Sequence, residues 1–170
     1  MRQLTRFVAA AAAIVMTTTS GATLGFGVPV AAADDTSSGS QVVPMGSVLR
    51  RCDWSKAPYV PSDSRGSVYA VISESGGSVT AEVHVQVVRP DIWYGVRLVQ
   101  MPRPTLGCGA GDPGVAVGRL YTDGGGNGTV TVSAPVMDGA TGAWVSVEGP
   151  VGVSNQLTGD FWTSDYVASF

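Results

Sequence analysis

An alternation of apolar and polar residues constrains this chain more than any other feature. Within residues 79–87 every second side chain is apolar: Val79, Ala81, Val83, Val85 and Val87. Because successive side chains of a β-strand point to opposite faces, this pattern indicates a strand with one buried face. Residues 34–170 contain 23 valines and only 5 leucines. Valine is stiff at χ1 and suits a pleated sheet better than a helix, so we expect an all-β fold.

Seven strands of this kind are expected after residue 66, separated by turns rich in glycine, proline and aspartate. They span residues 67–73, 79–87, 92–101, 115–121, 129–136, 143–148 and 156–166. No segment shows the apolar period of a helix. Short strands at this spacing predict that residues 66–170 form a single antiparallel β-sandwich, immunoglobulin-like or superoxide dismutase-like. A closed barrel is the alternative.

Two segments precede this predicted domain. Residues 1–33 hold Arg2 and Arg6 but no acidic residue, followed by an apolar run over residues 7–16, and they end in three alanines. This is the pattern of a signal peptide cleaved after residue 33, and the apolar run is shorter than the roughly 20 residues that span a bilayer. Residues 34–65 are rich in serine and proline and lack any strand or helix period. We therefore expect an extended, irregular N-terminal arm.

The two cysteines of the chain predict one disulfide. Export would place the protein in an oxidising compartment, outside the cell or in the cell envelope, where a pair of cysteines most simply forms a bond. Cys52 and Cys108 enclose a loop of 57 residues, counting both ends. A zinc or redox pair is the alternative, but the chain has no C-x-x-C motif and a single histidine. The expected bond attaches the arm to the long loop of residues 102–114.

Net charge excludes one class of partner. Without residues 1–33 the chain carries 8 basic and 13 acidic residues, a net charge of −5 (8 − 13). A chain with this balance lacks the cationic surface that binds nucleic acid through its phosphates. Signal cleavage would also remove the one segment able to enter a membrane, so no membrane span is expected. The composition leaves the oligomeric state open.

Catalytic residues are sparse in this sequence. His84 is the single histidine, on the polar face of its strand beside Glu82, and no G-x-S-x-G motif supplies a nucleophile. A carboxylate pair drawn from Glu74, Glu82, Glu148 or Asp160 could hydrolyse glycosides, although acidic residues on outward strand faces are usually solvated. We expect no catalytic residue, no metal ligand and no cofactor. A carboxylate-based secreted hydrolase is the alternative.

Four aromatic residues form the candidate binding face. Three of them fall on strand faces opposite the valine, isoleucine and leucine side chains: Trp93, Trp144 and Trp162. Tyr166 joins them as the fourth. Such an exposed platform would stack on sugar rings or on side chains of another protein. The alternative is that a bulge shifts the strand phase, or that the arm around Trp54 folds over these rings. The predicted function is binding of a protein or glycan partner of the cell envelope, by a non-enzymatic protein; a purely structural envelope role is the other possibility.

Several stretches resemble segments of known exported proteins. They begin Tyr94-Gly-Val-Arg-Leu, Cys108-Gly-Ala-Gly, Gly118-Arg-Leu-Tyr-Thr and Gly142-Ala-Trp-Val-Ser. Over residues 66–170 the chain is similar to uncharacterised small exported proteins of mycobacteria and related actinobacteria, which implies export but no activity. A looser similarity to chordin-type repeat domains implies a binding or structural module. Copper and zinc superoxide dismutases read H-x-H where this chain has His84-Val85-Gln86, so that likeness implies architecture without the metal centre.

Overall fold

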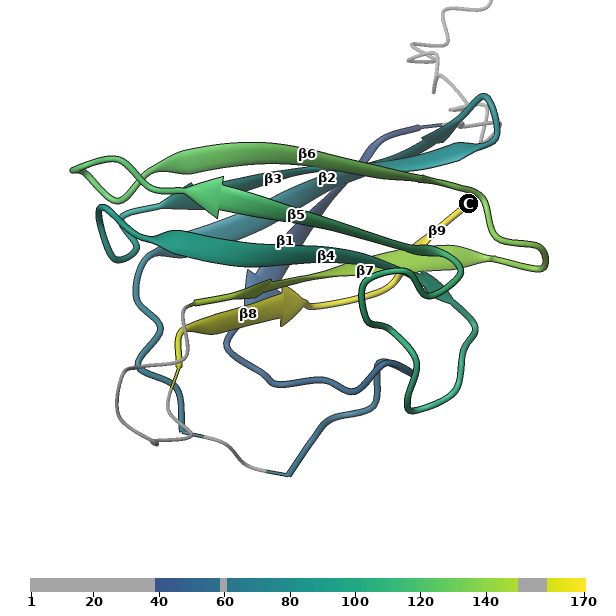
Figure 1. Cartoon of the computed structure of the whole chain (residues 1–170), viewed down its shortest axis with the longest axis horizontal. Coiled ribbons are helices and arrows are strands. Elements are labelled where there is room, and N and C mark those ends of the chain that lie inside the picture. Colours follow the sequence, from purple (N-terminus) through teal and green to yellow (C-terminus); the bar gives the residue numbers. More distant parts are fainter. Residues whose placement is uncertain (1–38, 59–60, 150–158) are drawn as a thin grey trace, which may run out of the picture. The chain divides into compact units, whose positions relative to one another are not determined.

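The structure is a computed structural model, and it describes residues 39–58, 61–149 and 159–170 (Figure 1). The regular elements of these residues are nine β-strands, so the all-β prediction is confirmed. The strands are β1 (Gln41–Gly46), β2 (Ser67–Ser75), β3 (Ser78–Gln86), β4 (Trp93–Met101), β5 (Val115–Tyr121), β6 (Gly128–Pro135), β7 (Gly142–Glu148), β8 (Phe161–Ser164) and β9 (Ala168–Ser169). In the described part of the chain, no helix is long and apolar enough to cross a membrane. The predicted signal segment, residues 1–33, lies outside the described residues.

All strand pairs are antiparallel and belong to one sheet. The order is β5-β4-β7-β8-β1-β2-β3-β6, and β9 pairs with one end of β7. The two strands at the ends of this order, β5 and β6, pack against each other, so the sheet curls into a nearly closed barrel (Figure 1). A Cβ atom at Gly118 of β5 would lie only 2.5 Å from Cγ1 of Val132 in β6. The absence of a side chain at Gly118 therefore permits this close approach.

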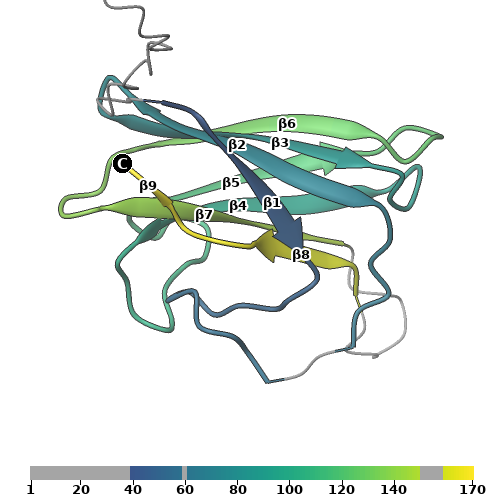
Figure 2. The ribbon, with the colours of Figure 1, turned by 180° about the vertical axis from the view of Figure 1, so that it is seen from behind.

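The predicted seven-strand sandwich is not confirmed, because the described residues contain two strands that the sequence did not indicate. One is the short β9. The other is β1, whose residues belong to the predicted irregular arm and which lies between β2 and β8 in the sheet (Figure 2). Only Val43 and Met45 of β1 point into the core, too few for a recognisable period. Pro44 interrupts the pattern further. It is tolerated because its backbone faces Asp165, beyond the end of β8, and there its carbonyl accepts a hydrogen bond from the Asp165 N–H (2.9 Å).

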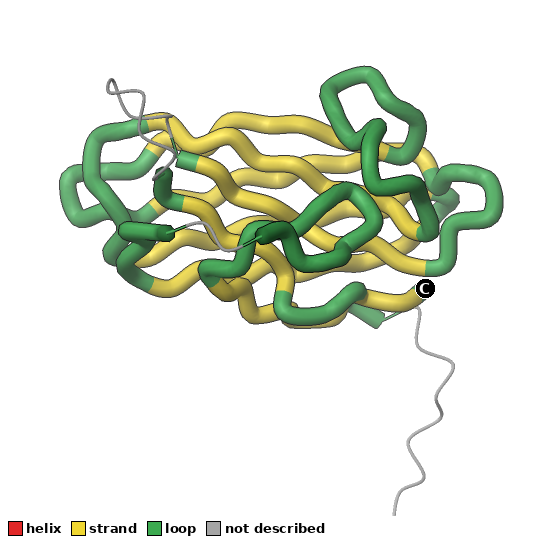
Figure 3. Tube along the Cα trace, turned by 90° about the horizontal axis from the view of Figure 1, so that it is seen from below, coloured by secondary structure: helices red, strands yellow, loops and turns green. Residues whose placement is uncertain are grey.

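The core fills the inside of the barrel. The alternating residues of β3 are buried as predicted, together with their partners on β2: Val79, Ala81, Val83, Val85, Val68, Ala70 and Ile72. Leu98 and Tyr94 of β4 complete the opposite wall. Val87 departs from the prediction, because β3 ends at Gln86 and Val87 turns away with φ at 56°. Outside the barrel, irregular segments of the chain cross one side of the sheet (Figure 3).

Candidate functional site

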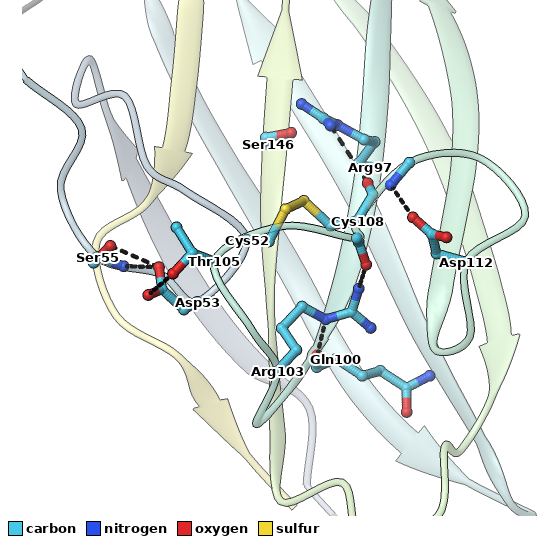
Figure 4. Close-up of a disulfide and its surroundings, with 12 residues drawn as sticks. Cys52, Asp53, Ser55, Arg97, Gln100, Arg103, Thr105, Cys108, Asp112 and Ser146 are labelled. Atoms are coloured by element: carbon cyan, nitrogen blue, oxygen red, sulfur yellow. Dashed lines mark hydrogen bonds between the residues drawn. A yellow bond between two sulfur atoms is a disulfide. The ribbon is translucent and has the colours of Figure 1, made fainter.

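The predicted disulfide is present between Cys52 of the arm and Cys108 of the loop of residues 102–114 (Figure 4). Two hydrogen bonds support it: the Cys52 N–H donates to the carbonyl of Thr105 (3.3 Å), and the Thr105 hydroxyl donates to Asp53 (3.0 Å). Arg97 of β4 donates to the carbonyl of Cys108 (3.4 Å), which ties the loop to the barrel. The arm and the loop thus form one structure on the outside of the sheet, as the sequence predicted.

Arg103 holds the shape of this loop. Its guanidinium donates to the carbonyls of Gln100 (2.8 Å), Gly107 (2.6 Å) and Pro113 (2.6 Å). These bonds use three of the five N–H donors of the guanidinium. Leu106 is the one large apolar side chain that this loop exposes. We therefore assign the loop a structural role.

The four aromatic residues of the predicted binding face do not lie on one exposed surface. Trp93 is 50% exposed and Tyr166 is 40% exposed, but Trp144 and Trp162 are only 2% and 3% exposed. The prediction of an exposed face is therefore wrong for Trp144 and Trp162.

Trp144 is covered by the arm, which was the alternative drawn from the sequence. It packs with Val99 and the disulfide, and Trp54 of the arm lies against the same cluster. The Trp54 indole N–H donates to the carbonyl of Ser164 (3.4 Å), which fixes the arm on β8. Trp162 is buried for a different reason: it faces the core, where its ring meets the Tyr94 ring edge to face at 5.7 Å. Every residue of β8 is buried, so both faces of this strand are covered. The alternation of polar and apolar residues in β8 therefore does not indicate which side chains face the core.

Trp93 is joined on the outer face by two residues that the sequence analysis had not grouped with it. It lies opposite Tyr121 across the β4–β5 pair, with ring centroids 5.1 Å apart and planes tilted by 54°. The guanidinium carbon of Arg119 lies 5.0 Å from the centroid of the Trp93 ring. All three side chains are exposed. We call this surface, formed by Trp93, Arg119 and Tyr121, the Trp93 patch.

The Trp93 patch carries one guanidinium and borders one carboxylate, because the Tyr121 hydroxyl donates to Asp91 (3.5 Å). Arg97, four residues beyond Trp93 on β4, forms an ion pair with Glu148. Arg119 has no carboxylate of the described residues within salt-bridge distance. Gly95 lies between Trp93 and Arg97 on β4, where it pairs with Arg119 of β5 and Glu148 of β7. Because it has no side chain, the backbone is exposed there. The patch therefore offers two aromatic rings for stacking and one guanidinium for hydrogen bonds to an acidic or hydroxylated ligand.

His84 lies in a cluster whose geometry resembles a catalytic triad. Its Nδ1 is 3.1 Å from the Thr129 hydroxyl and its Nε2 is 3.0 Å from the Glu82 carboxylate, while its ring stacks on Tyr69 at 4.6 Å. The strand register accounts for these contacts, because His84 lies directly opposite both Tyr69 and Thr129. The cluster sits on the outward face of β2, β3 and β6, and we assign it to cross-strand stabilisation of the sheet.

A cleft of about 510 Å³ opens between the segment before β2 and the β3–β4 connection. It is lined by Asp63, Arg65, Val87, Val88, Arg89, Pro90 and Asp160. Asp160 is only 5% exposed. Its two carboxylate oxygens lie 3.2 Å from Arg89 Nε and 3.3 Å from Arg89 Nη2. The buried Tyr94 hydroxyl donates to the same carboxylate (3.1 Å).

The pKa of the Tyr94 hydroxyl lies well above its usual range, because the group is buried and because it faces the Asp160 carboxylate. Tyr94 therefore stays protonated and remains a hydrogen-bond donor at neutral pH. The hydrolase alternative needs two carboxylates that flank one cleft, and Asp63 and Asp160 do line this cleft. Both oxygens of Asp160, however, are engaged by Arg89 and Tyr94. This arrangement suits a carboxylate that anchors an arginine better than one that acts as a nucleophile or base.

Comparisons with known proteins do not identify the chain. No family model, curated protein or solved structure matches it. Within the described residues, no three His, Cys, Asp or Glu side chains are grouped so that they could hold a metal ion. The sequence resemblance to exported actinobacterial proteins stays a prediction, and the function has to be argued from the Trp93 patch and the cleft.

The sequence contained a partial signal for the Trp93 patch. Arg119 and Tyr121 alternate along one face of a predicted strand, but only the strand register places that face beside Trp93. The cleft had no such signal. Its residues come from three separate segments of the sequence. From the sequence, Arg89 and Pro90 indicated only a turn between two strands.

Proposed function

We propose that the protein is an exported, non-enzymatic binding protein whose Trp93 patch binds a glycan of the cell envelope or its surroundings. The observation that carries this proposal is the exposure of two neighbouring aromatic rings, tilted by 54° to each other, beside an arginine that forms no salt bridge with any described residue. Aromatic rings of this size are usually buried, and an exposed cluster of them is typical of a binding surface. Flat rings stack well on the apolar faces of sugars.

Arg119 narrows the class of glycan. Its guanidinium is a fixed positive charge with five hydrogen-bond donors, in a chain whose net charge is −3. A sugar with a carboxylate, such as a uronic acid, would use both this charge and the aromatic rings. We therefore propose an acidic glycan as the partner, and binding that weakens as salt is added.

Two observations support an exported protein. The disulfide between Cys52 and Cys108 is compatible with an extracellular location, because such bonds persist in oxidising compartments. Residues 1–33 have the composition of a signal peptide. Mass spectrometry of the protein from a culture medium should give a chain that begins at Asp34 and lacks two protons at the cysteines. A secreted chain that retains residues 1–33 or two free thiols would contradict this part of the proposal.

The binding proposal is tested by calorimetric titration of the disulfide-bonded protein with a uronic-acid oligosaccharide and with its uncharged counterpart. We expect the acidic sugar to bind more tightly. Trp93→Ala should weaken its binding about tenfold, which corresponds to loss of about 1.4 kcal/mol. Tyr166→Ala is the matched control, since Tyr166 is a similarly exposed aromatic outside the patch. Equal affinities for the two variants, or no binding of either sugar, would favour a protein partner or a structural role.

A further inference from the structure

The cleft beside Asp160 holds charged groups that the Trp93 patch does not explain. Arg89 is held by Asp160 through Nε and Nη2, yet about half of its side chain is exposed. Its Nη1 contacts no acceptor in the described part of the chain. The buried carboxylate therefore presents Arg89 at the cleft surface in a fixed orientation. An arginine fixed in this way loses little conformational freedom when it binds a ligand.

Two further charges lie on the wall formed by the segment before β2. Arg65 and Asp63 are both exposed and both line the cleft. Neither forms a salt bridge among the described residues. Together with Arg89 they offer two guanidinium groups and one carboxylate to the same space. A ligand that matches this set carries one negative group and a nearby hydrogen-bond donor.

Val87 adds an apolar wall in a strained conformation. Its φ of 56° is in the left-handed region, which β-branched residues rarely adopt, and its side chain is 70% exposed. Gly66 lies against this bend, and a Cβ at Gly66 would overlap the carbonyl oxygen of Gln86. The fold thus holds an exposed valine at the rim of the cleft. Strained residues of this kind are concentrated at ligand sites.

We propose that this cleft binds a small 2-amino or 2-hydroxy acid. The carboxylate of the ligand would lie between Arg65 and Arg89, and its ammonium or hydroxyl group would donate to Asp63. An apolar side chain on the ligand would pack against Val87 and Pro90. The cleft volume of about 510 Å³ is within the range of small-molecule sites. A phosphate dianion fits less well, because Asp63 would repel its second charge.

The test is a titration of the isotope-labelled, disulfide-bonded protein, followed through its backbone amide NMR signals. Leucine, acetate and inorganic phosphate serve as the three probes. Leucine should shift the signals of Gly66, Val87 and Val88, and it should bind more tightly than acetate, with phosphate weakest. Shifts that do not saturate with leucine, or that occur elsewhere on the barrel, would overturn the proposal.

Two variants and one control assign the roles. Arg65→Gln should weaken leucine binding at least about fivefold, and it leaves the Arg89–Asp160 pair intact, so the fold is preserved. Asp63→Asn should reduce the preference for leucine over acetate, because only the contact of the side chain of leucine with Val87 and Pro90 would remain to favour leucine. Arg119→Gln, a matched change in the Trp93 patch, should not alter leucine binding. Wild-type affinity for leucine in Arg65→Gln would overturn the proposal. Because Arg119→Gln changes only the Trp93 patch, a failure of the amino-acid site can be distinguished from a failure of the glycan site.

Discussion

At the scale of single residues, Val87 and Tyr94 show how the cleft constrains local structure. Val87 adopts a left-handed φ that costs about 1–3 kcal/mol, and Gly66 is needed to accommodate the resulting bend. Tyr94 is fully buried and donates to a buried carboxylate. Both residues belong to the surroundings of Asp160. Stability measurements on each residue therefore report directly on the geometry of this site.

Replacement of Val87 by glycine should stabilise the protein. Glycine adopts a positive φ without strain, and the lost side chain is largely exposed, so relief of strain should exceed the added flexibility of the unfolded chain by about 1 kcal/mol. Urea unfolding measures this change. Val117→Gly is the matched control, because Val117 is an exposed valine inside strand β5, and there glycine should destabilise. Equal destabilisation by both changes would show that Val87 is not strained.

Tyr94 should make the protein lose stability at alkaline pH. Its pKa is raised in the folded state, first by burial and then by the nearby Asp160 carboxylate, whereas the unfolded chain ionises near pH 10. The contribution of the neutral hydroxyl is therefore complete below pH 10 and is lost as the pH rises above it.

The variant Tyr94→Phe should be about 2 kcal/mol less stable at pH 7, because it lacks the hydrogen bond to a charged acceptor. It should also lose less stability than the wild type between pH 9 and pH 11. Thermal unfolding across this interval measures both effects. Tyr121→Phe, a change at an exposed ring, is the control. An alkaline loss in Tyr94→Phe as large as that of the wild type would contradict this account.

At the scale of elements, the strands differ in how clearly the sequence predicts them. The alternation in β3 is visible because one of its faces is solvated, and the structure confirms it. In β7 six of the seven residues are buried, since the arm covers the outer face, so the pattern that usually marks the inward side is lost. Trp144 was placed on an exposed face for this reason. β1 escaped prediction because its two inward residues and one proline show no period.

Reduction of the disulfide should loosen the arm and expose Trp144. The bond closes a loop between residues 56 positions apart, and its loss removes roughly 4 kcal/mol of stability. Trp144 packs on this disulfide, so its fluorescence should shift to longer wavelength. The same reduction in Trp144→Phe should give a smaller shift. This variant should fold, because the buried indole N–H of Trp144 has no acceptor in the described part of the chain to lose. An unchanged spectrum on reduction would contradict the packing of the arm.

At the scale of the whole molecule, closure of the barrel depends on the close approach of β5 and β6. β5 therefore has β6 on one side and β4 on the other, and its pairing with β4 carries the Trp93 patch. From the sequence, the all-β class, the disulfide and the exposure of Trp93 could be predicted. The curvature of the sheet could not, because it depends on contacts between strands such as that of Gly118 with Val132.

A side chain at Gly118 should open this closure. Gly118→Ala places a Cβ against Val132, whose branched side chain has little freedom to move, and we expect a loss of about 1–3 kcal/mol. The double variant Gly118→Ala with Val132→Ala should be less destabilised than the sum of the two single changes. Gly124→Ala, at a turn with open space around the glycine, is the neutral control. Strict additivity of the two changes in chemical denaturation would show that the strands do not meet there.

Acrylamide quenching of tryptophan fluorescence, with and without an acidic glycan, tests whether the Trp93 patch is the binding surface. Trp93 is exposed and Trp54 is half-buried, while Trp144 and Trp162 are buried. We expect Trp93→Phe to lower the quenchable emission to the part that comes from Trp54, and a saturating uronic-acid oligosaccharide to protect the wild-type emission to a similar extent. Quenching as strong in Trp93→Phe as in the wild type, or quenching that a saturating sugar leaves unchanged, would show that the Trp93 patch is not the binding surface.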